Sequence, residues 1–231
     1  MEAEEATISS EAEEYLEAIY RLEKKTGFAK TMELASQLKV VPGSVTNTIE
    51  GLERRGLVVH EPYRGVKLTE KGRKLALNVL RRHRLAERLL TEVLGLEWSR
   101  VHEAACRLEH AIATDVVKPL EKALGNPKTC PHGNPIPSES GEIVEEESES
   151  LMKLEPREKG IIVKVTEEKR EVLQHLATLG LVPGTAIEMK ERELSRGPII
   201  VKVMKSSHTL DRDIASIIWV KRLISRGDIH A

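Results

Sequence analysis

The chain of 231 residues has few aromatic side chains, few cysteines and no long apolar run. Phe, Trp and Tyr make up 3% of it, so stacking of bases on aromatic rings is not expected to be a main binding device. Its two cysteines are too few for a disulfide framework, and a reducing compartment would keep both as thiols. No apolar run reaches 18 residues, and the acidic N-terminus lacks the apolar core of a signal peptide. We therefore expect a cytoplasmic protein without a membrane segment.

A uniformly basic surface is also missing. The 36 Lys and Arg residues are balanced by 37 Asp and Glu residues, which gives a net charge of −1. This average argues against a wholly basic nucleic-acid binder, although it does not exclude a basic face on one domain. The length allows one large domain or two to three small ones.

Three helical patterns followed by a hairpin are predicted in the first part of the chain. The helices read "SEAEEYLEAIYRLEKK" (10–25), "TMELASQLKV" (31–40) and "PGSVTNTIEGLERRG" (42–56). Two short β-patterned runs, "LVVHE" and "VKLT", are separated by the turn "PYRG". This order is that of a winged helix-turn-helix, whose second helix enters the major groove of DNA.

The predicted recognition helix begins with small and polar side chains suited to DNA. Asn47 can pair with an adenine edge, Ser44 and Thr46 suit phosphate oxygens, and Arg64 lies at the hairpin tip. The predicted DNA contacts are Gly43, Ser44, Thr46, Asn47, Arg54 and Arg64. The alternative is that "LERRGLV" simply ends a solvated helix in any three-helix domain.

The rest of the chain changes from helical to β character. Thr69 is expected to cap a long helix, and 98–124 reads as helical again. The segment 126–150 holds four prolines and a Ser/Glu-rich run, which predicts a loop and a flexible acidic linker. Short strands with glycine turns follow, typical of a small barrel. We predict an α+β fold with a winged helix-turn-helix (1–74), a helical dimerisation domain (75–137), an acidic linker (138–153) and an SH3-like small β-barrel (154–231).

The stretch "VHEAACRLEH" (101–110) carries the first sign of metal chemistry. In a continuous helix, His102, Cys106, Glu109 and His110 would share one stripe, because their offsets are 0, 4, 7 and 8. Burying these groups without partners would cost about 1–3 kcal/mol each. A metal ion removes that cost, and mixed N, O and S ligands suit Fe²⁺, Mn²⁺, Co²⁺, Ni²⁺ or Zn²⁺.

Other pairs have the spacing of ligands but also an ordinary interpretation. His83 and Glu87 stand at i and i+4, where a surface ion pair is the simpler explanation, and Glu14 and Glu17 at i and i+3 can form a solvated face. Cys106 among alanines can serve as a small apolar filler. Cys130 and His132 in "TCPHG" can bind metal, yet two such residues in a Pro/Gly loop are more often part of loop structure.

Together these segments resemble the diphtheria toxin repressor family of metal-dependent transcriptional regulators. The resemblance rests on "EEYLEAIYRLE", "GSVTNTIEGLERRGLV", "RHRLAERLLTEVLGL", "VHEAACRLEH" and "HGNPIP" (132–137), and it covers essentially the whole chain. The segment "LATLGLVPGTAIEM" is similar to the family's SH3-like domain, which is shared with small ferrous-transport-associated proteins.

The resemblance implies two metal sites in each subunit. Cys106, Glu109 and His110 match ligands of the primary site, and a first-helix side chain completes it. Iron-type members have Met at the position of Glu14. Manganese-type members have a carboxylate there, another at the position of Glu17, and Glu at the position of Cys106, so this chain is a hybrid. The ancillary site is matched by His83, Glu87 and His102, with Glu167 or Glu168 as the plausible donor from the SH3-like domain and Glu167 taken as the candidate. The alternative is that this domain stabilises the protein without donating a ligand.

The function expected from this resemblance is that of a homodimeric repressor of metal-uptake genes that binds double-stranded operator DNA. Fe²⁺ is the expected activator, Mn²⁺ is the alternative, and Co²⁺, Ni²⁺ or Zn²⁺ should substitute in vitro. The ion would hold the two recognition helices near one duplex turn apart, about 34 Å. No catalytic residue is predicted, because no phosphate loop, HExxH or nucleophile motif occurs. The rival interpretations are a metal-dependent hydrolase and a winged-helix regulator that senses a small organic ligand.

Overall fold

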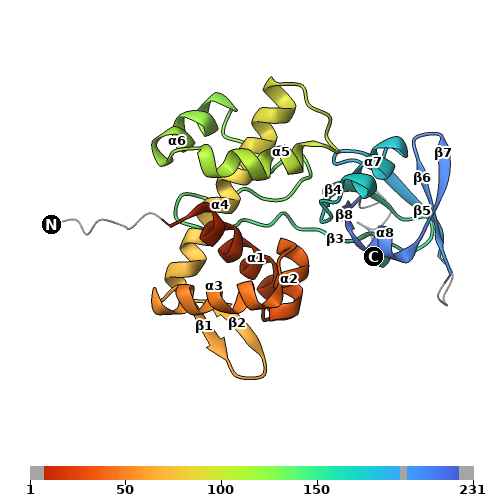
Figure 1. Cartoon of the computed structure of the whole chain (residues 1–231). Coiled ribbons are helices and arrows are strands. Elements are labelled where there is room, and N and C mark those ends of the chain that lie inside the picture. Colours follow the sequence, from red (N-terminus) through yellow and green to blue (C-terminus); the bar gives the residue numbers. More distant parts are fainter. Residues whose placement is uncertain (1–7, 193–196, 224–231) are drawn as a thin grey trace, which may run out of the picture. The chain divides into compact units, whose positions relative to one another are not determined.

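The computed structural model describes residues 8–192 and 197–223 (Figure 1). The chain divides into two compact units. In the described part, the first unit comprises residues 8–83, 109–114 and 137–142. The second unit comprises residues 84–108, 115–136, 143–192 and 197–223. Residues 193–196 and 224–231 of the predicted C-terminal domain lie outside the described residues.

The first unit contains the predicted winged helix-turn-helix. Its helices are α1 (Ser10–Thr26), α2 (Thr31–Leu38) and α3 (Pro42–Arg54), and its strands β1 (Val58–Glu61) and β2 (Gly65–Leu68) form an antiparallel hairpin. Pro42 occupies the first turn of α3, where its missing N–H has no helical partner to lose. The buried side chains include Leu16, Ile19, Leu34, Val45 and Leu52. Each helix therefore turns one apolar face toward a common core, as the periodicity predicts.

Helix α4 (Glu70–Arg88) begins at the cap that the sequence predicts. The Thr69 Oγ1 accepts a hydrogen bond from the Gly72 N–H at 3.1 Å. A Cβ on Gly72 would lie 1.9 Å from the Leu57 carbonyl oxygen, so only glycine allows this close approach. A π-helical turn, η1 (Leu89–Val93), follows the helix.

The stretch 98–124 is helical over most of its length, as predicted, but it does not form a single helix. Helix α5 (Val101–Leu108) ends before a 3₁₀ turn, η2 (Glu109–Ala111), and α6 (Thr114–Ala123) is separate. Glu109 is buried with its carboxylate against His83, so a tertiary contact overrides the local helical pattern. The single stripe of polar residues is consequently interrupted after Cys106.

The second unit contains a six-stranded antiparallel sheet in the order β3-β8-β4-β5-β6-β7. Its elements in chain order are β3 (Glu149–Ser150), the 3₁₀ turn η3 (Leu151–Lys153), β4 (Lys159–Val165), α7 (Arg170–Thr178), β5 (Ala186–Arg192), β6 (Ile199–Val203), β7 (Ser206–Leu210), α8 (Arg212–Ser216) and β8 (Ile218–Arg222). Alternate residues of β6, namely Ile199, Val201 and Val203, are buried in the core of the sheet. The predicted α+β class is confirmed.

The acidic segment that we expected to be flexible forms ion pairs with the sheet. Glu145 lies 2.6 Å from the Nζ of Lys164, and Glu149 lies 2.8 Å from the Nε of Arg222. Exposed pairs of this kind contribute little individually, at most about 1 kcal/mol. Among the described helices, none has both the length and the apolar character required to cross a bilayer.

Candidate metal centres and nucleic-acid interface

The N-terminal half of α3 presents the polar side chains predicted to read DNA. Gly43, Ser44, Thr46 and Asn47 are all exposed, whereas Val45 between them is buried. The Thr46 hydroxyl donates to the Pro42 carbonyl oxygen at 3.2 Å, within its own helix. The side chain of Asn47 is longer than those of Ser44 and Thr46 and is exposed. The surface has the composition needed for base contacts, and the individual contacts remain predictions.

The hairpin tip adds positive charge beside an aromatic ring. The guanidinium carbon of Arg64 lies 5.4 Å from the centroid of the Phe28 ring, and the Nζ of Lys67 lies 4.1 Å from it. Tyr63 has a φ of 64° and is fully exposed. Arg54 is also exposed. This arrangement favours phosphate contacts by the wing.

A cluster of carboxylates and imidazoles lies within the first unit. We call it the head cluster, and its members are Glu13, Glu14, His83, Glu109 and His110. The Nδ1 of His83 lies 2.5 Å from one oxygen of Glu109, and the Nε2 of His110 lies 3.2 Å from the other. The same Nε2 lies 3.8 Å from a carboxylate oxygen of Glu14. Helices α1 and α4 and the turn η2 therefore contribute to one polar centre.

Burial dominates the electrostatics of the head cluster. Desolvation raises the pKa of Glu109, the hydrogen bond from His83 opposes this, and the charge of Glu17 adds to the rise. Glu17, a predicted ligand, is itself buried and accepts a hydrogen bond from the Nη2 of Arg21 at 2.6 Å. A bound cation would favour the ionised form of Glu109.

The head cluster fits a divalent ion on one further observation. The Nε2 of His110 is buried and has no hydrogen-bond partner among the residues that the structure describes. Buried polar groups are normally satisfied, so an unpaired nitrogen that faces two carboxylates fits a ligand of a cation. Carboxylate and imidazole donors suit Fe²⁺ and Mn²⁺.

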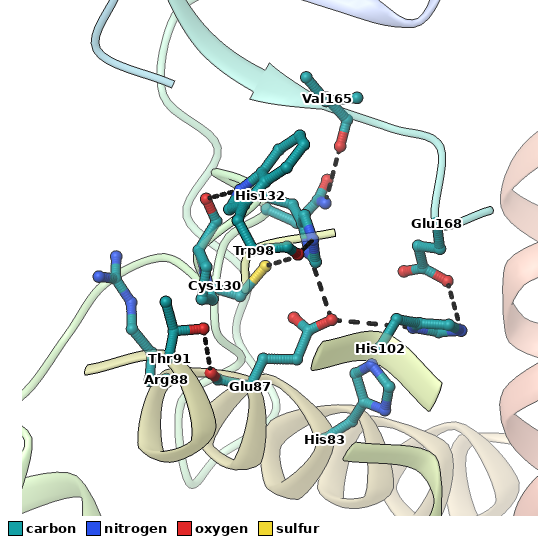
Figure 2. A network of polar contacts seen from close by, with 12 residues as sticks. His83, Glu87, Arg88, Thr91, Trp98, His102, Cys130, His132, Val165 and Glu168 are labelled. Carbon is teal, nitrogen blue, oxygen red and sulfur yellow. Dashed lines mark hydrogen bonds and ion pairs between the residues drawn. The ribbon is translucent and has the colours of Figure 1, made fainter. Parts of the chain in front are cut away.

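A second cluster, in the second unit, includes two residues that the sequence analysis set aside. We call it the loop cluster, and its members are Glu87, His102, Cys130, His132 and Glu168. Ligand atoms of Glu87, Cys130 and His132 lie within 4.8 Å of one another, and all three residues are buried. Figure 2 shows the Glu87 carboxylate between the two imidazoles, 3.2 Å from the Nδ1 of His132 and 3.7 Å from the Nδ1 of His102.

The thiols and carboxylates of the loop cluster and its surroundings raise the pKa of both imidazoles. Burial lowers the pKa of His132, but contacts with Cys130 and Glu87 outweigh it and raise this pKa to about 10. Burial likewise opposes the effects of Cys106, Glu87 and Glu168 on His102, whose pKa is raised to about 9. Imidazole ligates a metal in its neutral form, so a cation at this site would have to displace these protons.

Hydrogen bonds from the surrounding chain set the orientation of His132. Its Nε2 lies 3.0 Å from the Trp98 carbonyl oxygen, so the N–H at this position donates there and Nδ1 faces Glu87. The Val165 N–H donates to the His132 carbonyl oxygen at 2.9 Å, and the Asn134 amide donates to the Val165 carbonyl at 3.1 Å. The loop that carries Cys130 and His132 is thereby attached to strand β4.

The structure groups several predicted ligands differently from the expected sites. His83 contacts Glu109 in the head cluster, whereas Cys106 lies 3.7 Å from the Nε2 of His102. Glu168, rather than the candidate Glu167, lies 3.5 Å from the Nε2 of His102. A carboxylate oxygen of Glu167 instead accepts from the backbone N–H of Glu168 and of Lys169. The ligand roles themselves remain predictions.

The sequence analysis did not place Cys130 and His132 beside Glu87, and it did not single out Glu13. The available signal for the first two was the spacing Cys-X-His in a short loop bounded by prolines, which places a thiol and an imidazole close together. Their third partner, Glu87, lies 43 residues before Cys130, so nothing local to the loop identifies it. Glu13 stands next to Glu14, and the helical pattern alone does not distinguish the two.

A winged helix-turn-helix combined with two clusters of metal-ligand type defines the class of metal-dependent DNA-binding regulators. Three family models match in chain order: "Iron dependent repressor, N-terminal DNA binding domain" at residues 7–66, "Iron dependent repressor, metal binding and dimerisation domain" at 69–138, and "FeoA domain" at 149–222. The chain belongs to the iron-dependent repressor family that includes the diphtheria toxin repressor.

Individual relatives agree with this membership. The chain is 47% identical over 125 residues to the iron-dependent repressor IdeR of Mycobacterium tuberculosis, a match that spans 54% of each protein. It is 33% identical over 223 residues to IdeR of Mycobacterium leprae, which covers 91% of this chain and 96% of that protein. A solved structure titled "Manganese-dependent transcriptional repressor complex with manganese" has 29% identity and a TM-score of 0.84, covering 92% of this chain and 100% of the other.

Family membership decides between the classes of function. The family consists of transcriptional repressors and not of enzymes, so the hydrolase interpretation is excluded. The match to a metal-binding and dimerisation domain supports a divalent metal cofactor and a dimer, and the match to an N-terminal DNA-binding domain supports binding to DNA. The prediction of a metal-dependent repressor is confirmed at this level.

Proposed function

We propose that this chain is an Fe²⁺-activated homodimeric repressor that binds operator DNA of metal-uptake genes in the cytoplasm, with Mn²⁺ as the alternative activator. The observation that carries the proposal is the head cluster, in which the DNA-binding head itself supplies Glu14 to a buried carboxylate–imidazole centre with Glu109 and His110. Helix α1 of the DNA-binding head and the turn η2 thus both contribute side chains to one polar centre. We propose Glu14, His83, Glu109 and His110 as its ligands.

The donor types bear on the choice of metal. The head cluster has oxygen and imidazole donors, which suit Fe²⁺ and Mn²⁺, whereas Cys130 gives the loop cluster a soft thiolate that Fe²⁺ and the later metals accept more readily. Iron accommodates both sets. We propose Glu87, His102, Cys130, His132 and Glu168 as donors of the second centre.

The mechanism follows from the charges of the head cluster. The carboxylates of Glu14 and Glu109 face the same side of His110, and burial disfavours the ionised form of Glu109 there. A bound divalent ion supplies the positive charge that these carboxylates lack. Glu14 then holds α1 toward Glu109 and His110, and the conformations of the head in which α3 is placed for DNA gain population.

The test uses duplexes selected from a random pool by the Fe²⁺-loaded protein under anaerobic conditions. Binding of these duplexes is then measured across buffered Fe²⁺, Mn²⁺, Co²⁺ and Zn²⁺ at fixed salt, because phosphate contacts make the affinity salt-dependent. We expect at least tenfold tighter binding with metal than with chelator, which corresponds to about 1.4 kcal/mol. Glu109→Gln should remove this gain.

A matched variant separates DNA recognition from metal binding. Asn47→Ala should bind metal as the wild type does and lose affinity for the selected duplex by about 1–3 kcal/mol. Equal affinity of the wild-type protein for the duplex with metal and with chelator would refute the proposed activation.

A further inference from the structure

Glu13 stands immediately before the proposed ligand Glu14 on α1, but its side chain has different partners. One carboxylate oxygen lies 2.7 Å from the Nδ1 of His110, and the other lies 2.5 Å from the Nη2 of Arg82. The Glu13 side chain is 15% exposed, whereas that of Glu14 is 56% exposed. Glu13 is therefore engaged on both of its oxygens inside the first unit.

These contacts determine what the His110 ring can offer. An ionised carboxylate can only accept hydrogen bonds, so the nitrogen that faces it must carry the proton. With the proton on Nδ1, the neutral imidazole has its lone pair on Nε2. This nitrogen is the buried atom that lacks a hydrogen-bond partner in the described part of the chain and lies 3.2 Å from Glu109 and 3.8 Å from Glu14.

Arg82 orients the carboxylate of Glu13, which in turn orients the imidazole of His110. Its guanidinium binds the oxygen of Glu13 that His110 does not use, so rotation of the carboxylate would break one of the two contacts. The side chain of Arg82 is 13% exposed, and a partly buried charge-assisted bond of this kind is stronger than a bond between neutral groups. Arg82, Glu13 and His110 thus form a chain of contacts from α4 through α1 to η2.

We propose that Glu13 is a positioning residue of the head cluster, which holds His110 with Nδ1 protonated and Nε2 directed at a divalent cation, without ligating the cation itself. This inference rests on the proposed function of the head cluster. Metal-binding histidines generally donate their second ring N–H to such a partner, and loss of that partner typically weakens metal binding about 10–100-fold. Glu13, like Arg82, would therefore affect metal affinity from outside the ligand set.

The first test measures Zn²⁺ affinity of the metal-free full-length chain by competition with a chromophoric chelator. The part of the Zn²⁺ titration that Glu109→Ala abolishes is assigned to the head cluster and is called the head-cluster phase. In Glu13→Ala this phase should weaken about 10–100-fold, and in Glu13→Gln by less, because the amide oxygen can still accept from Nδ1. The matched control Glu11→Gln, an exposed position in the first turn of α1, should leave it unchanged.

The second test reads the ring directly through ¹⁵N NMR of His110 in the Zn²⁺-loaded chain. The expected spectrum has a protonated Nδ1 and a metal-bound Nε2. A metal-bound Nδ1 with a protonated Nε2 would overturn the proposal, and so would equal head-cluster affinity in Glu13→Ala and Glu11→Gln. A purely structural role would lower the melting temperature without this graded loss of affinity, and it would equally overturn the proposal.

These measurements distinguish failure of the proposed function from failure of the positioning role of Glu13. If the wild-type chain has no Zn²⁺ phase that Glu109→Ala abolishes, the head cluster is not a metal centre and the proposed function fails together with the role of Glu13. If the phase exists and does not respond to Glu13→Ala, only the positioning role is overturned.

Discussion

The two imidazoles of the loop cluster make the metal-free protein sensitive to pH. Burial lowers the pKa of both rings from the ordinary value of 6.5, but polar contacts outweigh it. Cys130 and Glu87 raise the pKa of His132 to about 10, and Cys106 and Glu87 raise that of His102 to about 9. The folded chain therefore holds protons that the unfolded chain releases. Their contribution to the free energy of unfolding is complete below about pH 6.5 and is lost as the pH rises through 9 and 10.

We expect the melting temperature of chelator-treated protein to fall between pH 7 and 10 by more than in a His102→Gln variant. Because the His102 side chain is 22% exposed, this variant removes one titrating group with limited disturbance of the core. If the melting temperatures of the two proteins fall by the same amount across this pH range, His102 does not titrate as described.

The sequence predicted the contacts of some site residues and not of others. Glu14, Glu109 and His110 could be predicted to meet, because the resemblance identified their positions. The separate role of Glu13 could not be predicted, since α1 carries Glu11, Glu13, Glu14 and Glu17 and a small rotation of the helix decides which of them faces His110. The choice between Glu167 and Glu168 likewise depends on a backbone turn in which Glu167 caps the N–H groups of the next two residues.

At the level of elements, the loop bearing Cys130 and His132 depends on a glycine. Gly133 has a φ of 84°, and a Cβ there would lie 1.9 Å from the Val163 carbonyl oxygen of β4. We predict that Gly133→Ala lowers the free energy of unfolding of the metal-free protein by more than about 1 kcal/mol, because both the backbone conformation and the contact with β4 are disfavoured. Urea denaturation measures the change.

Gly95→Ala is the matched control for this loop. Gly95 also has a positive φ, 66°, but a Cβ there would meet no atom within 4 Å. The difference between the two variants isolates the approach of the loop to β4. Equal losses would mean that this approach contributes nothing to stability.

Elements with strong local signals were predicted correctly, and elements determined by distant contacts were not. The start of α3 at Pro42, the Thr69 cap and the hairpin are local features of the sequence, and the structure has all three. The break between α5 and α6 was missed because the carboxylate of Glu109 is bound by His83, 26 residues earlier. The ion pairs of the acidic linker were missed for the same reason, since Lys164 and Arg222 belong to strands far along the chain.

At the level of the whole molecule, the proposed function requires that metal and DNA act on each other. If a divalent ion raises the affinity for operator DNA tenfold, the same duplex must raise the affinity for the ion tenfold, because the coupling free energy of about 1.4 kcal/mol belongs to both equilibria. We expect this reciprocity to depend on the head cluster, since it contains a residue of the DNA-binding head. Titration of Mn²⁺ into the protein with and without the selected duplex, followed by electron paramagnetic resonance, measures it.

Variants of the two clusters assign this coupling to one of them. Glu109→Gln should abolish the effect of DNA on the remaining Mn²⁺ affinity, whereas Cys130→Ser should weaken the loop cluster and leave the coupling of the head cluster intact. The residues explain this expectation. His110 contacts Glu13 and Glu14 of α1, whereas His132 contacts Glu87 of α4, Trp98 and Val165 of β4. Loss of coupling in Cys130→Ser with retention in Glu109→Gln would reverse the assignment and make the loop cluster the regulatory centre.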